Sequence, residues 1–210
     1  MPVDAVQYPV NLNLKGKPCL VVGGGSVAAR KVAGLQSCGA EVTVIATVAG
    51  PAVRALGATV VERPYRPGDA SGYRLVVAAT GDPEVNQVVF DDAELSGVWV
   101  NSADDPARCT FTVPAVVRQG PIMVAISTGG HSPALAAWLR SRTEARLGPE
   151  YGILVGMLSE ARNDLMAAGR STDQVDWRKV LDSDMLDQIR AGRVGQARER
   201  LRACLSLSSD

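Results

Sequence analysis

Short apolar runs alternate with helical patterns along the first half of the chain, and this alternation constrains the fold more than any other feature. Helical patterns over 26–38 and 82–95 lie between runs that are typical of strands. Strands that alternate with helices form a parallel sheet covered on both faces, and such buried strands are near-continuously apolar. The sequence therefore predicts an α/β fold with a doubly wound parallel sheet. The expected strands are 19–22, 41–46, 58–62, 74–79 and 97–101.

The pattern changes after Pro106. Two β-rich stretches, 109–117 and 122–128, are separated by a short polar turn, which is typical of a hairpin. Ser132 and Pro133 are typical of a helix N-cap and first helical position, and helical spacing continues towards the end of the chain. We expect three parts: the sheet domain over 1–113, a hairpin and helix over 114–148, and a small helical domain over 149–210.

A glycine-rich turn, Val22–Ala28, follows the first expected strand and opens the first expected helix. It fits G-x-G-x-x-A, in which the first glycine permits a tight turn and the second lets the backbone approach a pyrophosphate. The alanine keeps the helix close to the sheet, and the helix N-terminus favours an anion. We therefore expect a Rossmann-type domain in which Gly23, Gly24 and Gly25 bind a dinucleotide. The alternative is a strand-to-helix turn without a ligand.

The usual acidic residue is missing from the second strand. An Asp or Glu that holds the ribose hydroxyl is expected about 20 residues after the glycine turn. Here the strand end reads Val44-Ile45-Ala46-Thr47-Val48, without an acid and without an adjacent arginine. Thr47 offers a weaker hydrogen bond to the ribose. The residues themselves therefore leave both NAD and NADP open.

A polar cluster, Asn101-Ser102-Ala103-Asp104-Asp105-Pro106, follows the fifth expected strand. Ligands of open α/β sheets bind beyond the carboxyl ends of the strands, so the cluster is well placed for function. Asp104 could act as a general base. The alternative is a purely structural turn, because Asp-Asp-Pro is a common turn sequence.

A second glycine-containing loop, Thr128-Gly129-Gly130-His131, precedes the helix that begins near Pro133. Two glycines before an N-capped helix leave backbone donors that suit a carboxylate or a phosphate. His131 is the only histidine of the chain. A lone loop histidine is more often structural or solvated than catalytic, so we do not assign it a proton transfer.

Composition excludes several classes of protein. The 210 residues contain 22 acidic and 22 basic side chains, which gives no overall field for nucleic acid or membrane. No apolar run approaches the roughly 20 residues that span a bilayer, and the N-terminus does not resemble a secretory signal. The four cysteines form no CxxC motif and lie far from the histidine, so we expect no metal site. We expect a cytoplasmic protein with reduced cysteines.

Four segments together resemble the precorrin-2 dehydrogenase and sirohydrochlorin ferrochelatase module of siroheme synthases. They are VVGGGSVAARK at 21–31, VVAATGDPEVNQ at 76–87, VNSADDP at 100–106 and FTVPAVVRQGPIMVAISTGGHSPALA at 111–136. The resemblance runs from about Tyr8 to Arg146, in order and at near-constant spacing. The methyltransferase portion of the longer siroheme synthases is missing, so a stand-alone module is expected.

The resemblance implies an activity and its residues. Precorrin-2, a polycarboxylated tetrapyrrole, is oxidised to sirohydrochlorin while NAD accepts the hydride. Some members of the family also insert ferrous iron, so a second, ferrochelatase activity is allowed. Asp104 takes the catalytic position. Cofactor contacts are expected at Gly23, Gly24, Gly25, Ser26, Val27, Thr47, Val48 and Thr80, and substrate contacts at Asn101, Thr128, Gly129, Gly130 and His131.

The resemblance also implies a homodimer, with 114–148 as the dimerisation segment and a cleft to which both subunits contribute. Nucleic acid and membrane are not expected partners. Two other hypotheses stay open. One is a non-enzymatic NAD-sensing regulatory module, although a sensor would not require the NxxDxP and STGGHSP segments. The other is an unrelated dehydrogenase of small metabolites, because a fold alone does not fix a function.

Overall fold

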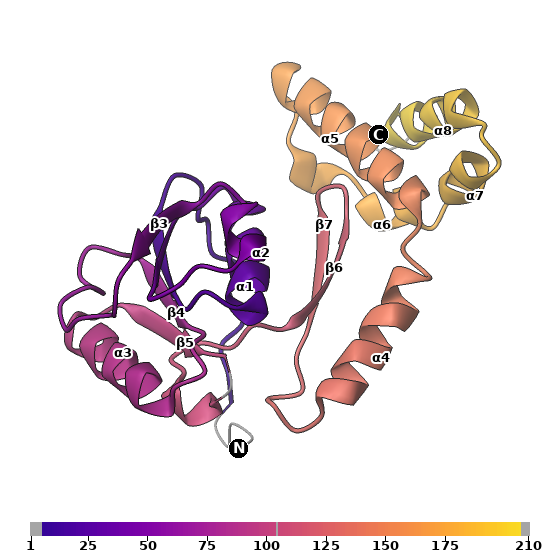
Figure 1. Cartoon of the computed structure of the whole chain (residues 1–210). Helices are drawn as coiled ribbons and strands as arrows, with labels where there is room; N and C mark the ends of the chain where they lie inside the picture. Colours follow the sequence, from indigo (N-terminus) through magenta and orange to yellow (C-terminus); the bar gives the residue numbers. More distant parts are fainter. Residues whose placement is uncertain (1–5, 104, 207–210) are drawn as a thin grey trace. The chain divides into compact units, whose positions relative to one another are not determined.

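Two compact units make up the computed structural model of the chain, which describes residues 6–103 and 105–206 (Figure 1). The first unit runs to Val113 and takes in the loop Gly129–Ser132. The second comprises Pro114–Thr128 and the chain from Pro133 onward. The function of 114–148 as a dimerisation segment stays a prediction.

The first unit is built on a five-stranded sheet in the order β3-β2-β1-β4-β5, and every ladder in it is parallel. This order confirms the predicted doubly wound α/β fold, because the chain reverses its direction of travel between β1 and β4. The strands are β1 (Pro18–Val22), β2 (Glu41–Ala46), β3 (Thr59–Glu62), β4 (Leu75–Ala78) and β5 (Trp99–Ser102). The helices are α1 (Ser26–Gln36), α2 (Pro51–Arg54), α3 (Pro83–Leu95) and the 3-10 helix η1 (Pro106–Arg108).

Each face of the sheet has its own core. Cys19 and Val21 of β1 pack into the core beneath α1 and α2, whereas Leu20 and Val22 pack into the core beneath α3. Figure 1 shows α1 and α3 on opposite faces of the sheet. Burial on both faces explains why these strands are apolar throughout rather than alternating.

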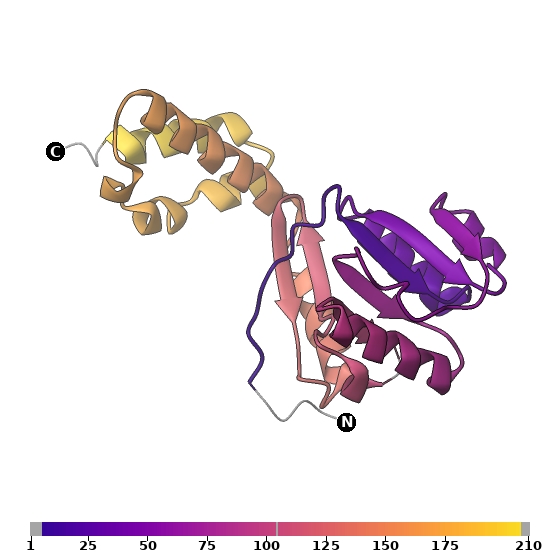
Figure 2. The same cartoon turned by 90° about the vertical axis from the view of Figure 1, so that its left-hand side faces the viewer.

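The second unit begins with a two-stranded antiparallel hairpin, β6 (Ala115–Gln119) and β7 (Ile122–Ile126). Gly120 occupies the left-handed region at the turn, with a φ of 56°. The remaining elements are α4 (Pro133–Glu144), α5 (Pro149–Ala167), the 3-10 helix η2 (Thr172–Gln174), α6 (Trp177–Leu181), α7 (Met185–Arg190) and α8 (Val194–Ser206). Figure 2 shows the helices from α5 to α8 gathered at one end of this unit.

The C-terminal helices enclose a core of their own. Met157 of α5, Val180 of α6 and Met185 of α7 are each at most 2% exposed. Helix α4 contributes to no such core, since it has no buried residue. Over the described residues, no helix combines the length and the apolar character needed to cross a bilayer.

One short helix was not predicted, and one local expectation was wrong. Helix α2 was not predicted, because four residues are too few to show helical periodicity. The stretch from Cys109 was expected to begin the hairpin, but Cys109 forms an isolated antiparallel bridge with Asn101 instead. Strand β5 lies at the edge of the sheet, so one of its sides faces no other strand of the sheet. The returning chain pairs with this side, and Thr110 N–H donates to the carbonyl of Val100 at 2.8 Å.

Candidate functional site

A pocket lies at the edge where the carboxyl ends of β1 to β4 meet. Its volume is about 580 Å³, within the range of small-ligand and cofactor sites. Every residue predicted to contact the cofactor lines it: Gly23, Gly24, Gly25, Ser26, Val27, Thr47, Val48 and Thr80. Individual contacts with a cofactor stay predictions, but the fold brings these distant segments to one cavity.

The three glycines of the turn serve different purposes. Gly23 has a φ of 127°, and a side chain there would collide with the backbone carbonyl of Ala79. A side chain at Gly24 would collide with the carbonyl of Val48. At Gly25 the backbone is extended, and a Cβ would meet nothing within 4 Å. The chain itself therefore does not require glycine at position 25, whereas a ligand that approaches the backbone does.

The glycine turn leads directly into a helix N-terminus that can receive an anion. Gly25 is the N-cap of α1 and offers no side-chain acceptor, and the first turn holds no acidic residue. The N–H groups of a first helical turn have no intrahelical acceptor and carry the positive end of the dipole. Ala28 is fully buried, so α1 packs closely on the sheet as the fingerprint requires. These features fit the pyrophosphate of a dinucleotide.

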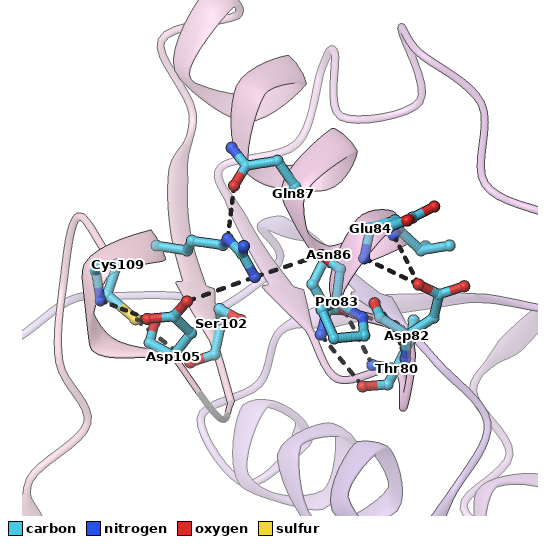
Figure 3. Close-up of polar contacts among 12 residues, drawn as sticks. Thr80, Asp82, Pro83, Glu84, Asn86, Gln87, Ser102, Asp105 and Cys109 are labelled. Carbon is cyan, nitrogen blue, oxygen red and sulfur yellow. Dashed lines mark hydrogen bonds and ion pairs between the residues drawn. The ribbon is translucent and has the colours of Figure 1, made fainter. Parts of the chain in front are cut away.

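Thr80 lines the pocket beside Gly23 and is held there by its own turn, which Figure 3 shows. Its hydroxyl donates to the side-chain oxygen of Asn86 at 2.6 Å, and Asn86 Nδ2 donates to the carbonyl of Thr80 at 3.2 Å. Asp82 then caps α3 by accepting the N–H groups of Glu84 and Val85. Because Asn86 is only 6% exposed, this network fixes the wall from inside the protein.

The part of the pocket wall that follows β3 was not predicted from the sequence. Arg63, Pro64 and Tyr65 also line the pocket. They belong to no recognisable motif, and about 40 residues of chain separate them from the glycine turn. Their only signal was that the third expected strand ends at the same edge of the sheet.

Two carboxylates hold this wall in place. Asp69 makes two hydrogen bonds to the Arg63 guanidinium, at 2.6 and 2.8 Å, and this pairing lowers the pKa of the Asp69 carboxyl. Asp92 of α3 accepts the Tyr65 hydroxyl at 2.5 Å together with the N–H groups of Gly68 and Ala70. Burial, followed by the bond to Asp92, raises the pKa of the Tyr65 phenol well above its usual range.

The second predicted cluster lies at the end of β5, and Asp104 itself falls outside the described residues. Its neighbour Asp105, which is labelled in Figure 3, accepts the Ala107 N–H at 2.9 Å and lies 3.4 Å from the Arg108 guanidinium. The structural role of an aspartate in this turn therefore falls to Asp105, which caps η1.

Asn101 is 6% exposed, and its side-chain amide is engaged within the first unit. It donates to Cys109 Sγ at 3.3 Å and to the Phe111 carbonyl at 3.0 Å, and it accepts from Lys31 Nζ at 3.4 Å. Asn101 does not line the cofactor pocket. Its predicted contact with substrate stays a prediction, while its observed contacts join β5 to the returning chain.

Cys109 fastens the turn that carries the cluster. Its thiol lies 3.3 Å from the carbonyl oxygens of Ser102 and of Asp105, to which it can donate. Burial is the main cause that raises the pKa of the Cys109 thiol, so the thiol remains a proton donor at neutral pH. The backbone on both sides of residue 104 is thereby held.

The remaining predicted site residues, Thr128 to His131, connect β7 to α4. Gly129 and Gly130 have φ values of 59° and 80°, so both occupy the left-handed region that glycine tolerates best. His131 is exposed. Within the described residues, no group of three or more His, Cys, Asp or Glu side chains is placed to hold a metal ion.

Two family models match the chain. The family described as "Putative NAD(P)-binding" matches residues 10–115, and the one described as "Sirohaem biosynthesis protein central" matches residues 119–145. The first match covers the sheet and its pocket. The second covers the turn of the hairpin, β7, the glycine loop and α4.

Curated relatives include siroheme synthases. The enzyme of Nitrosococcus oceani is 38% identical over 207 residues, which cover 95% of this chain and 44% of the relative. That of Methylobacillus flagellatus is 35% identical over 209 residues, or 94% of this chain and 44% of the relative. The chain thus spans less than half the length of these relatives.

A solved structure, "SirC, precorrin-2 dehydrogenase", superposes with a TM-score of 0.74 at 27% sequence identity. The superposition covers 94% of this chain and 98% of SirC. These matches confirm the predicted resemblance and the NAD-type cofactor. Because the first family model spans half of the chain, the chain belongs to that NAD(P)-binding family, and its likeness to siroheme synthases extends over more than nine-tenths of its length.

Proposed function

We propose that the chain is an NAD-dependent dehydrogenase that oxidises precorrin-2 to sirohydrochlorin in siroheme biosynthesis. The observation that carries the proposal is the dinucleotide pocket at the glycine turn, in a chain whose fold matches a precorrin-2 dehydrogenase nearly end to end. Siroheme synthases as sequence relatives support the same pathway.

The pocket residues bind and orient the cofactor. The Gly25 turn and the N-terminus of α1 receive the pyrophosphate, while Thr47 and Val48 lie where the adenosine ribose is expected. The Thr80 turn bounds the pocket on the β4 side, next to the end of β5 in the sheet. NAD, when bound, supplies the hydride acceptor.

Asp104 is the proposed general base. Oxidation of precorrin-2 removes a proton as well as a hydride, and a carboxylate beyond the end of β5 is suited to accept that proton. Asp105 supports this assignment, because it already performs the turn-forming role that an aspartate could have in this segment. The two acids of Asp-Asp-Pro therefore divide between chemistry and structure.

The substrate's carboxylates call for hydrogen-bond donors. The Thr128–His131 loop is the proposed carboxylate site, because two glycines in the left-handed region lead the chain into the N-terminus of α4, and a helix N-terminus favours an anion. Asn101 is a proposed substrate residue of the β5 end, where it also orders the local backbone.

A homodimer forms part of the proposal. Helix α4 has no buried residue, and Leu135 and Trp138 on it are 46% and 54% exposed. A two-stranded hairpin beside such a helix is marginal alone, so pairing with a second copy would bury both in an isologous interface.

Location and iron insertion complete the proposal. We place the reaction in the cytoplasm, since none of the four cysteines, all of which the structure describes, forms a disulfide, as is usual in a reducing compartment. Ferrous iron is proposed as a second substrate, because the sequence relatives are named siroheme synthases and siroheme contains iron.

The test is incubation of the chain with precorrin-2 and NAD, with NADH formation followed by absorbance. Precorrin-2-dependent NADH formation supports the proposal. NAD binding without turnover would favour an NAD-sensing module, and turnover of simple hydroxy acids instead would favour an unrelated dehydrogenase. Addition of ferrous iron to the same mixture then tests chelation through the spectrum of the tetrapyrrole.

A further inference from the structure

The position that commonly determines whether a pocket accepts the ribose of NAD or of NADP holds an uncharged residue in this chain. The residue after β2 is Thr47, where dinucleotide-binding proteins commonly place an acid for the ribose hydroxyls. In the ladder between β2 and β3, Ala46 is paired with Glu62. Thr47 and Arg63 are therefore the next residues of two neighbouring strands, which lie about 4.8 Å apart in a sheet. Both of them line the pocket.

Glu62 is not the missing acid. Its Oε1 accepts the Ala49 N–H at 3.0 Å and lies 2.5 Å from the Arg54 guanidinium. Glu62 does not line the pocket. The charge that faces the ribose end of the pocket is thus that of Arg63.

Arg63 does not act as an unpaired cation. Its two terminal nitrogens bond the two oxygens of Asp69 at 2.6 and 2.8 Å, and Nη1 also reaches the Pro64 carbonyl at 3.0 Å. The side chains of Arg63 and Asp69 are 29% and 17% exposed. A bidentate pair of this kind is rigid and neutral overall, and its fork is already committed to a carboxylate.

Asp69 also accepts the Arg66 N–H at 2.8 Å, but the loop that carries the pair has further anchors that do not involve Asp69. Asp92 of α3 binds the Tyr65 hydroxyl and the N–H groups of Gly68 and Ala70, and Asp92 itself is 8% exposed. A variant of Asp69 should therefore keep the loop folded, which makes the pair accessible to mutagenesis.

We infer that the Arg63–Asp69 pair sets the preference of this pocket for NAD over NADP. The inference rests on the proposed function. Asp69 occupies the guanidinium that would otherwise bind a ribose 2′-phosphate, and its negative charge offsets the attraction of that guanidinium for the phosphate. The ribose hydroxyls of NAD carry no charge, so NAD loses nothing by this pairing. Specificity thus comes from a carboxylate that acts through an arginine, rather than from an acid at the end of β2.

The test measures the dissociation constants of NAD and NADP by calorimetry on the full chain and compares their ratio among variants. Asp69→Asn releases the guanidinium and removes the negative charge, so NADP should gain on NAD by about tenfold, or about 1.4 kcal/mol. In Arg63→Gln/Asp69→Asn the gain should disappear. Arg63→Gln alone leaves Asp69 unpaired, so NADP should lose on NAD by about tenfold.

Asp91→Asn is the matched control. It removes the same charge from an exposed position on α3, where Asp91 accepts a hydrogen bond from Gln87 at 2.7 Å and does not line the pocket. Its ratio should equal that of the wild type. An equal gain in Asp91→Asn would reduce the effect to general charge, and a gain that persists in the double variant would exclude Arg63; either result overturns the inference.

Failure of the inference and failure of the proposed function are distinguishable. If the wild type binds NAD and oxidises precorrin-2, yet the ratio is unmoved in folded Asp69→Asn and in Arg63→Gln, only the inference is wrong. If the wild type binds neither dinucleotide, the proposed function is wrong and the inference falls with it. Circular dichroism of each variant establishes folding. If Asp69→Asn does not fold, the ratio of the NAD and NADP dissociation constants in Arg63→Gln tests the inference.

Discussion

The cofactor end of the sheet and the α4 region differ in how far their side chains are bonded or buried within their own unit. At the sheet end, the polar side chains that shape the pocket are held by partners within the same unit, as Asn86, Asp69 and Asp92 show. On α4 no residue is buried, and Leu135 and Trp138 are about half exposed.

The two regions are therefore suited to different binding partners. The pocket has hydrogen-bonded walls and an open volume, which suit a small ligand. The α4 surface carries two apolar side chains that are about half exposed, as the proposed homodimer interface would. Mutations at the first should change chemistry and ligand affinity, whereas mutations at the second should change assembly.

The largest effect should come from Asp104→Asn. The amide keeps the shape of the carboxylate but cannot accept a proton, so NADH formation from precorrin-2 should fall by about 10² to 10⁴. The affinity for NAD, measured by calorimetry, should hold, because the glycine turn is untouched.

His131→Ala is the comparison for that variant, because His131 lies in the loop before α4. Its turnover should fall by less than about tenfold, since no proton transfer is assigned to it. An Asp104→Asn enzyme near wild type together with an inactive His131→Ala enzyme would move the acid–base role to the glycine loop.

The next largest effect should come from Gly25→Val. A branched side chain would enter the open space in front of the turn, so NAD should bind at least about 100-fold more weakly. Gly34→Val is the control, because Gly34 lies on the exposed side of α1, away from the pocket, and also has open space beside it. Equal NAD affinity in folded Gly25→Val and in the wild type would displace the cofactor from this turn.

A tryptophan in each unit allows a matched test of the α4 surface. Trp138 on α4 is 54% exposed and Trp99 on β5 is 45% exposed. Trp138→Glu should raise the dimer dissociation constant by about 30-fold, as for a central interface residue. Trp99→Glu should leave it within about threefold, as for a residue outside the interface. Sedimentation that shows a monomer for the wild type at micromolar concentration would contradict the proposed assembly.

The sequence predicted the sheet end of the molecule well, because local patterns specify it. Burial on both faces makes the parallel strands apolar throughout, and the glycine turn needs particular residues at fixed spacing. Strand β2 begins and ends at the predicted residues, and Asp82 with Pro83 marks the start of α3. These features depend on residues that are close together in the sequence, so local sequence patterns reveal them.

Features that depend on distant segments were missed. Arg63 reaches the pocket only because β3 lies next to β2 in the sheet, and its pairing with Asp69 depends on the course of the following loop. Cys109 was assigned to the hairpin because its surroundings are β-rich, but the free edge of β5 is a nearer partner. Such outcomes follow from three-dimensional competition for hydrogen bonds, which residue spacing does not encode.

The smallest effect concerns stability, and it compares one ion pair from each unit. Arg63–Asp69 is 29% and 17% exposed, whereas Arg198–Glu160 of the helical unit is 48% and 58% exposed. Asp69→Asn should lower the melting temperature by about 3 °C at pH 7, and Glu160→Gln by less than about 1 °C, since exposed pairs are screened by water and salt.

The pKa of Asp69 is lowered in the folded protein, so the pair contributes its full stabilisation above the ordinary carboxyl pKa of 3.8. It loses this contribution as the pH falls through the pKa of the folded state. The difference between wild type and Asp69→Asn should therefore be full at pH 7 and shrink below about pH 3.8 in calorimetric scans. A difference that stays constant down to pH 2 would mean that Asp69 acts through packing rather than through its charge.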